Sequence, residues 1–360
     1  MLDQRRYDID WLRVIAIGLL VIYHIAILFQ PWALFVGFIR SDEPAEGLWP
    51  PMTLLNVWRI PFLFFVSGMG VYFAMRKRNI KQLLLDRALR IALPYAIGIV
   101  AIVPLHFLLF QAYYGQPLHY FAHPAHLWFL GNLTIYISIL FAPFYYFMRK
   151  TNGQFHQALT RYMSNPLGPL SVALFFVLEV LLVRPGIFTL YAQTLHGYAI
   201  GFVAFFFGFL FVYTGSTLWQ TLLTWRWAYL ALAIGLAILR FTHYQGSAPN
   251  TLMAVESHLW ILSLFGFGYR YLNHPSATLR YLSQSAYPVY IIHMIVLHAA
   301  ASLILPLAIP PGLQFVAIVG STLIGCLLIY ELIIRRIPIL RPIFGLPFRP
   351  KAKAQTQVVA

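Results

Sequence analysis

The feature that most constrains the fold of this chain is a succession of long apolar runs separated by short polar segments. A helix needs about 20 predominantly apolar residues to cross a bilayer. About ten runs approach or reach this length, although the fifth and the seventh are short or interrupted. The runs comprise residues 11–29, 54–74, 91–113, 126–148, 168–184, 199–217, 227–241, 252–272, 286–307 and 313–334. Only 10% of the residues are charged, whereas a soluble domain carries about 25%, so the sequence predicts an all-α, polytopic bundle of about ten transmembrane helices.

The Lys and Arg residues are divided unevenly between the two sides of this predicted bundle. If the N-terminus is cytoplasmic, 20 of the 25 Lys and Arg residues lie in cytoplasmic segments, and four lie outside, namely Arg40, Arg59, Arg184 and Arg240. Cytoplasmic loops of membrane proteins are enriched in Lys and Arg. The sequence therefore predicts that both termini are cytoplasmic. Because the net charge of +15 is spread over these short loops, we do not expect a nucleic-acid partner.

The segments between the runs are too short to form a separate folded domain. Residues 1–340 are therefore predicted to be a single integral-membrane domain, and residues 341–360 a basic, disordered cytoplasmic tail beside anionic headgroups. The one cysteine, Cys326, cannot form an intramolecular disulfide. The histidines are scattered, with no HExxH motif and no cysteine partner, so we expect no metal site.

Within the first run, the segment RVIAIGLLVIYH begins and ends with an ionisable residue, Arg13 and His24. Eleven residues turn a helix through roughly three full turns and rise about 16 Å, so the two side chains share one face. Ionisable residues inside transmembrane helices usually face a protein interior or a cavity. In the alternative interpretation, Arg13 extends to the cytoplasmic interface and His24 only hydrogen-bonds to a neighbouring helix.

A pair of arginines marks the cytoplasmic start of the third run. The segment RALRIALPY places Arg87 and Arg90 three residues apart on one helix face. A pair of guanidinium groups beside a bundle entrance can bind a phosphate bidentately. Topogenic charge is an equally good explanation of this pair from chemistry alone.

Further polar residues lie toward the predicted outer side. Arg59 lies near the outer end of the second run, where a lipid-facing arginine would be costly. His126 and Trp128 begin the fourth run, at a depth where aromatic residues also form an interfacial belt. Glu179 is flanked by apolar residues in the fifth run. His293, in the ninth run, is expected to be structural rather than catalytic.

Five motifs occur in the order in which they are found in a known family. They are Arg13-x10-His24, FFVSG at 64–68, Arg87-x-x-Arg90 followed by Pro94, HLWFL at 126–130 and SAYPVYIIH at 285–293. On these motifs the chain resembles the acyltransferase 3 family, bacterial multi-pass enzymes that O-acylate carbohydrates and other cell-surface acceptors. Within that family it is most similar to the branch of glucan biosynthesis protein C, which is associated with succinylation of osmoregulated periplasmic glucans.

The resemblance implies a location in the bacterial inner membrane, a cytoplasmic acyl-coenzyme A donor and an acceptor hydroxyl on the outside. The family's essential first-helix arginine and histidine correspond to Arg13 and His24, and its paired arginines to Arg87 and Arg90. One departure is Leu133, which stands where many members carry a glutamate in a WSLxxE pattern. A role for a glutamate at that position therefore cannot be transferred.

We accordingly expect Arg87, Arg90 and Arg13 to bind the phosphates of acetyl- or succinyl-coenzyme A, a co-substrate and not a permanently bound cofactor. The pantetheine arm would follow the first helix through a passage to His24, the predicted general base on the acceptor hydroxyl. The predicted acceptor-side residues are Arg59, His126, Trp128 and Glu179.

Two other classes of function remain open on the sequence. A transporter or flippase of a glycan or lipid-linked intermediate would also need buried arginines and a cavity. A purely structural partner of a glycan synthase would not depend on His24.

Overall fold

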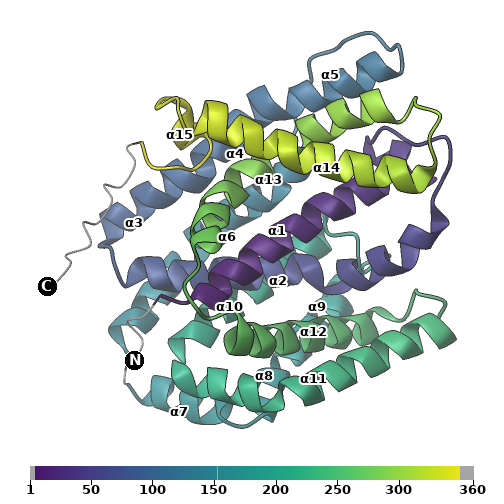
Figure 1. The fold of residues 1–360 in the computed structure, drawn as a ribbon. Coiled ribbons are helices and arrows are strands. Elements are labelled where there is room, and N and C mark those ends of the chain that lie inside the picture. The colour runs from purple at the N-terminus through teal and green to yellow at the C-terminus, as the bar shows by residue number, and fades with distance from the viewer. Residues whose placement is uncertain (1–4, 152, 349–360) are drawn as a thin grey trace, which may run out of the picture.

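The computed structural model describes residues 5–151 and 153–348, and within these ranges every regular element is a helix (Figure 1). Nine helical segments of the described residues are long and apolar enough to cross a membrane, and one bent pair raises the number to as many as ten. The spans are Tyr7–Ile27, Glu46–Met75, Ile80–Tyr113, Ala125–Arg149, Leu195–Tyr213, Ser216–His243, Asn250–Tyr271, Ala277–Ile304 and Pro311–Ile334. The predicted polytopic helical bundle is therefore confirmed.

The fifth predicted run, 168–184, corresponds to the second member of the bent pair. Helix α7 (Gln154–Met163) and the α8–α9 segment (Leu167–Val183) meet at 97°. Proline cannot continue a helix because it lacks an amide hydrogen, and Pro166 lies in the break. The side chain of Asn165 accepts a hydrogen bond from the Leu167 amide at 2.9 Å, which supports the new helix start.

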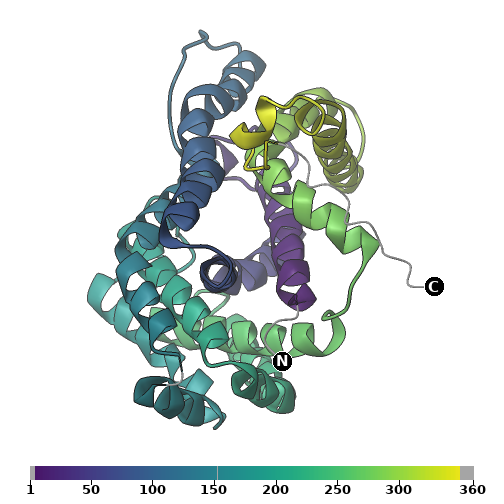
Figure 2. The same ribbon diagram turned by 90° about the vertical axis from the view of Figure 1, so that its left-hand side faces the viewer.

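Helix α1 (Tyr7–Ile27) occupies the interior of the bundle. It packs against α2 (Trp49–Met75), α12 (Asn250–Tyr271) and α13 (Ala277–Ile304). Figure 2 shows α1 in purple beside α13 in green. On this helix Arg13 and His24 each line a hollow between helices.

A glycine contact sets the spacing between α2 and α10 (Leu195–Tyr213). A Cβ atom on Gly68 would lie 2.0 Å from the carbonyl oxygen of Phe205, and one on Gly208 would lie 2.1 Å from that of Phe65. Small residues allow transmembrane helices to approach this closely. The Gly68 of the FFVSG motif is therefore a packing residue, as its small size suggests.

The third span contains two wide turns. π-helical segments at Ala88–Ala92 and Gly98–Ile102 interrupt it, and each is followed by an α-helix with proline near its start. Pro94 has no amide hydrogen to donate to the carbonyl oxygen of Arg90, which favours a wide turn before it. Such π-bulges occur frequently at functional sites, and Arg90 lies within the first of them.

A buried ion pair joins α11 (Ser216–His243) to α12. The guanidinium of Arg240 donates to both carboxylate oxygens of Glu256, at 2.8 and 2.9 Å, and both side chains are fully buried. Trp260 also donates to this carboxylate, at 3.3 Å.

The C-terminal part of the described chain is folded. After Ile334, a short helix α15 (Leu340–Ile343) packs on the third span, and Arg341 donates to the carbonyl oxygens of Pro347 and Arg335. Residues 341–348 were predicted to belong to a disordered tail, whereas the structure shows the end of α15 there and backbone hydrogen bonds within the segment, such as that from Leu346 to Arg341. The rest of that predicted tail, 349–360, lies outside the described residues.

Candidate active site

Two cavities lie along α1, one at each end of the Arg13–His24 face. We call the first the arginine cavity, a hollow of about 320 Å³ lined by Arg13, Arg87 and Arg90. Ser67 and Tyr287 also line it, and residues 345–347 of the C-terminal segment form part of its wall. A smaller hollow of about 270 Å³ shares Arg13 and adds further basic side chains, among them Arg5, Arg6 and Lys77.

In the arginine cavity, three arginines are paired with only two carboxylates. Arg13 pairs with Asp10 at 2.9 Å, whereas Arg90 and Arg87 both approach Asp86, at 2.7 and 3.6 Å. The Nε of Arg87 is buried and has no hydrogen-bond partner. The cavity therefore retains positive charge and unused donors, a combination that suits an anion with several oxygen atoms.

We call the second hollow the histidine cavity. It has a volume of about 440 Å³ and is lined by four histidines, namely His24, His106, His123 and His126. Arg59 lines the same cavity, as do Tyr23 and several aromatic side chains that include Trp32, Trp49 and Trp128. The structure thus places Arg59, His126 and Trp128 around His24, although these residues come from three different parts of the sequence.

The hydrogen bonds of His24 define which of its nitrogens is available. Its Nδ1 lies 2.8 Å from Nε2 of His293, and the Nδ1 of His293 lies 2.6 Å from the carbonyl oxygen of Tyr290. A carbonyl oxygen can only accept, so His293 donates from Nδ1 and, when neutral, accepts at Nε2. His24 must then donate from Nδ1, which leaves the lone pair of its Nε2 free. A neutral imidazole in this form can act as a base in the cavity.

Arg59 is a buried cation without a carboxylate partner among the described residues. Only 3% of its surface is exposed, and its guanidinium lies 4.0 Å from the centre of the Tyr23 ring. Nη2 donates to Asn56 Oδ1 at 3.0 Å, whereas Nε and Nη1 are buried without a partner. An uncompensated buried charge is costly, so this guanidinium is suited to an anionic group that enters the cavity.

His126 is fixed by two hydrogen bonds to α13. Its Nε2 donates to the carbonyl oxygen of Ile291 at 3.0 Å, and its own carbonyl oxygen accepts from the Tyr290 hydroxyl at 2.6 Å. Its Nδ1 is buried and unpaired, so it offers a hydrogen-bond acceptor beside the cavity. Trp128 lines the cavity and packs edge-on against Phe64, with ring centres 6.1 Å apart.

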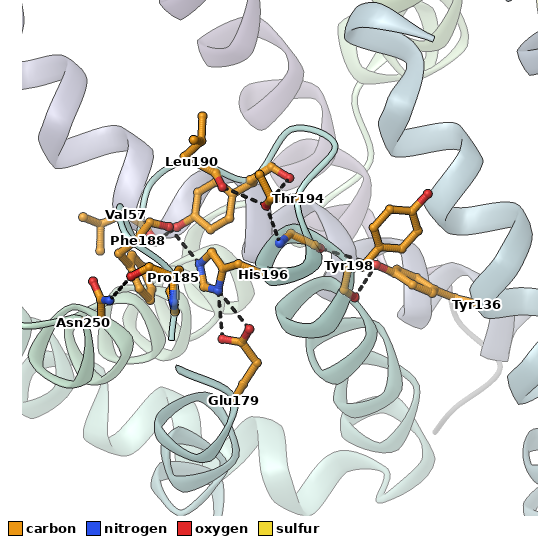
Figure 3. Close-up of polar contacts among 12 residues, drawn as sticks. Val57, Tyr136, Glu179, Pro185, Phe188, Leu190, Thr194, His196, Tyr198 and Asn250 are labelled. Carbon is orange, nitrogen blue, oxygen red and sulfur yellow. Dashed lines mark hydrogen bonds and ion pairs between the residues drawn. The ribbon is translucent and has the colours of Figure 1, made fainter. Parts of the chain in front are cut away.

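Glu179 does not line either cavity. Its carboxylate accepts from Nδ1 of His196 at 2.9 and 3.0 Å, and the Nε2 of His196 donates to the carbonyl oxygen of Phe188 at 2.8 Å (Figure 3). Both side chains are buried. The contact holds the loop after α9 (Val172–Val183), whose Tyr191 lines the histidine cavity and donates from its hydroxyl to Val57. In this structure Glu179 thus lies behind the wall of the histidine cavity, in contrast to the acceptor-side position expected from the sequence.

The two cavities share no lining residue. Phe64, Phe129 and Tyr290 pack between them, with ring centres 4.4 Å apart for the first two and 6.3 Å for the last two. We call these three residues the aromatic layer. Along α2, Phe64 lies between a residue that lines the arginine cavity and one that lines the histidine cavity. Tyr290 has the same position along α13. In this structure the two cavities are therefore separate hollows and not the continuous passage expected from the sequence.

Sequence reasoning did not find the partnership of His293 with His24. The signal available was the SAYPVYIIH motif, whose last residue is His293, but no periodicity shows which helix that histidine faces. Leu133, which stands in the place of a family glutamate, lines the arginine cavity. No group of three or more His, Cys, Asp or Glu residues is arranged to hold a metal ion in the part of the chain that the structure describes.

Of three comparisons with known proteins, one gave a match. Comparisons with curated proteins and with solved structures gave no match. A family model described as an acyltransferase domain, that of acyltransferase 3, matches residues 6–331. The match covers nearly the whole bundle, the histidine cavity and the arginine cavity except for residues 345–347 of its wall. The chain therefore belongs to the acyltransferase 3 family of membrane acyltransferases.

Proposed function

We propose that this membrane acyltransferase moves an acyl group from acyl-coenzyme A to a hydroxyl of an envelope glycan or a related envelope acceptor. The observation that carries the proposal is the position of the arginine cavity and the histidine cavity at the two ends of one face of α1. Arg13 lines the first and His24 the second, and eleven residues of helix span about 16 Å.

Arg87, Arg90 and Arg13 bind the phosphates of the donor in this proposal. Three guanidinium groups beside two carboxylates leave a positive site, and charge-assisted bonds from arginine suit phosphate oxygens. The Asp86 carboxylate keeps Arg90 and Arg87 oriented between turnovers.

The pantetheine arm has to pass the aromatic layer to bring the thioester to His24. Phe129 is partly exposed, whereas Phe64 is fully buried, so rotation of Phe129 is the smaller rearrangement. Donor binding would open the layer, and the layer would otherwise keep water and ions from crossing the bundle.

His24 acts as the general base in the transfer. Its Nε2 takes the proton of the acceptor hydroxyl while that oxygen attacks the thioester carbonyl carbon. When the tetrahedral intermediate collapses, the carbon–sulfur bond breaks and His24 returns the proton to the leaving thiolate. General-base catalysis of this kind contributes typically about 10²–10⁴-fold.

The acceptor and the acyl group meet in the histidine cavity. His126 accepts a hydrogen bond from the acceptor through its free Nδ1, and Trp128 supplies an apolar surface for a sugar ring. Arg59 contacts the distal carboxylate if the acyl group is succinyl, and an acetyl group would leave it unpaired. The likeness to the glucan biosynthesis protein C branch supports a periplasmic glucan as the acceptor.

The same proposal fixes the orientation and location of the chain. The arginine cavity faces the cytoplasm, where acyl-coenzyme A is made, so both termini are cytoplasmic and the membrane is the bacterial inner membrane. The distribution of Lys and Arg supports this orientation.

Reconstituted protein tests the proposal. Proteoliposomes are supplied with radiolabelled acyl-coenzyme A on one side and a glucan acceptor on the other, and the acceptor is analysed by mass spectrometry. Acylated glucan that forms only when the donor is present supports the proposal. Movement of unmodified glycan without the donor would indicate a transporter instead.

A further inference from the structure

His293 is the only partner of a ring nitrogen of His24 within the described residues. The two rings are nearly parallel, at 3°, with centres 5.1 Å apart. His293 is fully buried and does not line the histidine cavity. It can therefore reach the reacting atoms only through His24.

The part of the His293 ring that points away from His24 is also held by contacts. Its Nδ1 donates to the carbonyl oxygen of Tyr290 on its own helix at 2.6 Å. The ring of His126 packs edge-on against it, with centres 5.1 Å apart at 85°. This packing leaves His293 one tautomer and one ring orientation, with Nε2 directed at His24.

We propose that His293 is a positioning residue that holds His24 in the tautomer protonated at Nδ1. The inference rests on the proposed function, in which Nε2 of His24 takes the acceptor's proton. In a Ser-His-Asp triad a carboxylate holds the histidine in this tautomer. No carboxylate contacts His24 in residues 5–151 and 153–348, and a neutral imidazole, itself fixed by a backbone carbonyl, fills that place.

A neutral partner has a physical consequence that a carboxylate would not have. It fixes the tautomer and orientation of His24 without placing a second full charge in the membrane interior, where an isolated ion is costly. The hydrogen-bonded series of the Tyr290 carbonyl, His293 and His24 thus aligns the base, and neither imidazole carries a charge in the resting site.

The closing experiment compares two substitutions at the same buried position. In His293→Gln the side-chain amide oxygen can still accept from Nδ1 of His24, whereas His293→Leu removes the acceptor with little change in volume. We expect the kcat of acyl transfer to fall roughly 10- to 100-fold in His293→Leu, the equivalent of one lost buried hydrogen bond. The KM for acyl-coenzyme A should not change, and His293→Gln should recover most of the kcat.

His258→Leu is the matched control. His258 is also fully buried, and its Nε2 hydrogen-bonds to a backbone carbonyl oxygen, that of Pro169, at 2.8 Å. It lines neither cavity, so its loss measures the general effect of removing a buried imidazole. A similar fall in kcat in His258→Leu and His293→Leu, or no recovery in His293→Gln, would overturn the proposal.

A second readout does not depend on acyl transfer. In protein labelled with ¹⁵N-histidine, the His24 signals are assigned by their loss in His24→Ala. We expect Nδ1 of His24 to be the protonated nitrogen in the unsubstituted protein and in His293→Gln, and Nε2 to become protonated in His293→Leu. An unchanged spectrum in His293→Leu would refute the positioning role. If the spectrum changes as expected but the unsubstituted protein transfers no acyl group, the proposed function fails and the positioning of His24 stands.

Discussion

Replacing Arg59 by methionine should reduce acyl transfer strongly while leaving the fold nearly as stable as before. The guanidinium is 3% exposed and has two buried nitrogens without a partner, Nε and Nη1. Each unsatisfied buried donor costs about 1–3 kcal/mol. Against this stand one hydrogen bond to Asn56 and the contact with the Tyr23 ring, worth about 1.5–3 and about 2 kcal/mol.

The costs and gains at Arg59 therefore nearly offset each other in the empty protein. A change of about 1 kcal/mol shifts the melting temperature by about 2–4 °C in a domain of 150–250 residues. We expect the Tm of Arg59→Met to lie within about 4 °C of that of the unsubstituted protein. If an anionic group of a substrate pairs with this guanidinium, loss of the guanidinium leaves the substrate's buried charge unpaired, which costs about 3–5 kcal/mol. The kcat/KM should then fall by about 10²–10⁴-fold.

The assay measures thermal unfolding and transfer kinetics on the same purified samples. Arg59→Lys, which keeps the charge and loses the planar fork, should be intermediate in kcat/KM. A large drop in the Tm of Arg59→Met with unchanged activity per folded molecule would refute the reasoning, because Arg59 would then be a structural residue.

Three further predictions follow from particular contacts. Arg87→Ala should raise the KM for acyl-coenzyme A about 10-fold or more, because it removes a hydrogen-bond donor to the phosphates. Arg149→Ala, at an exposed position outside the cavities, should leave this KM unchanged. A rise in the KM for the acceptor alone would contradict the assignment. Gly68→Ala should lower the Tm, because the new Cβ would lie 2.0 Å from a backbone oxygen and overpacking costs about 1–3 kcal/mol. Gly235→Ala, whose new Cβ would have nothing within 4 Å, should not lower it. Glu256→Gln should destabilise the protein by about 3–5 kcal/mol because it leaves buried Arg240 without its counter-charge. The kcat per folded molecule should stay the same. An unchanged Tm would show that the pair adds no stability.

The fold was largely predictable from the sequence because the length and spacing of apolar runs depend only on bilayer thickness and helix rise. The shared face of Arg13 and His24 followed from helix periodicity, and the structure places both beside cavities. The sequence showed the fifth run as short, but it did not predict the helix that precedes this run or the 97° bend between the two.

Contacts between helices could not be predicted in this way. His24 and His293 are 269 residues apart, and nothing in either helix shows that they face each other. The role of Glu179 was missed because its partner, His196, lies on another helix. The aromatic layer was missed for a similar reason, since Phe64 and Tyr290 each look like ordinary core residues until the helices are packed together.

The central claim, that His24 is the base of an acyl transfer, is tested most directly by one comparison in reconstituted protein. Acyl transfer to the glucan acceptor and binding of acyl-coenzyme A are measured side by side for the unsubstituted chain and His24→Ala. We predict that transfer is lost in His24→Ala while the amount of protein and the affinity for acyl-coenzyme A are retained. Transfer at an unchanged rate in His24→Ala would contradict the account.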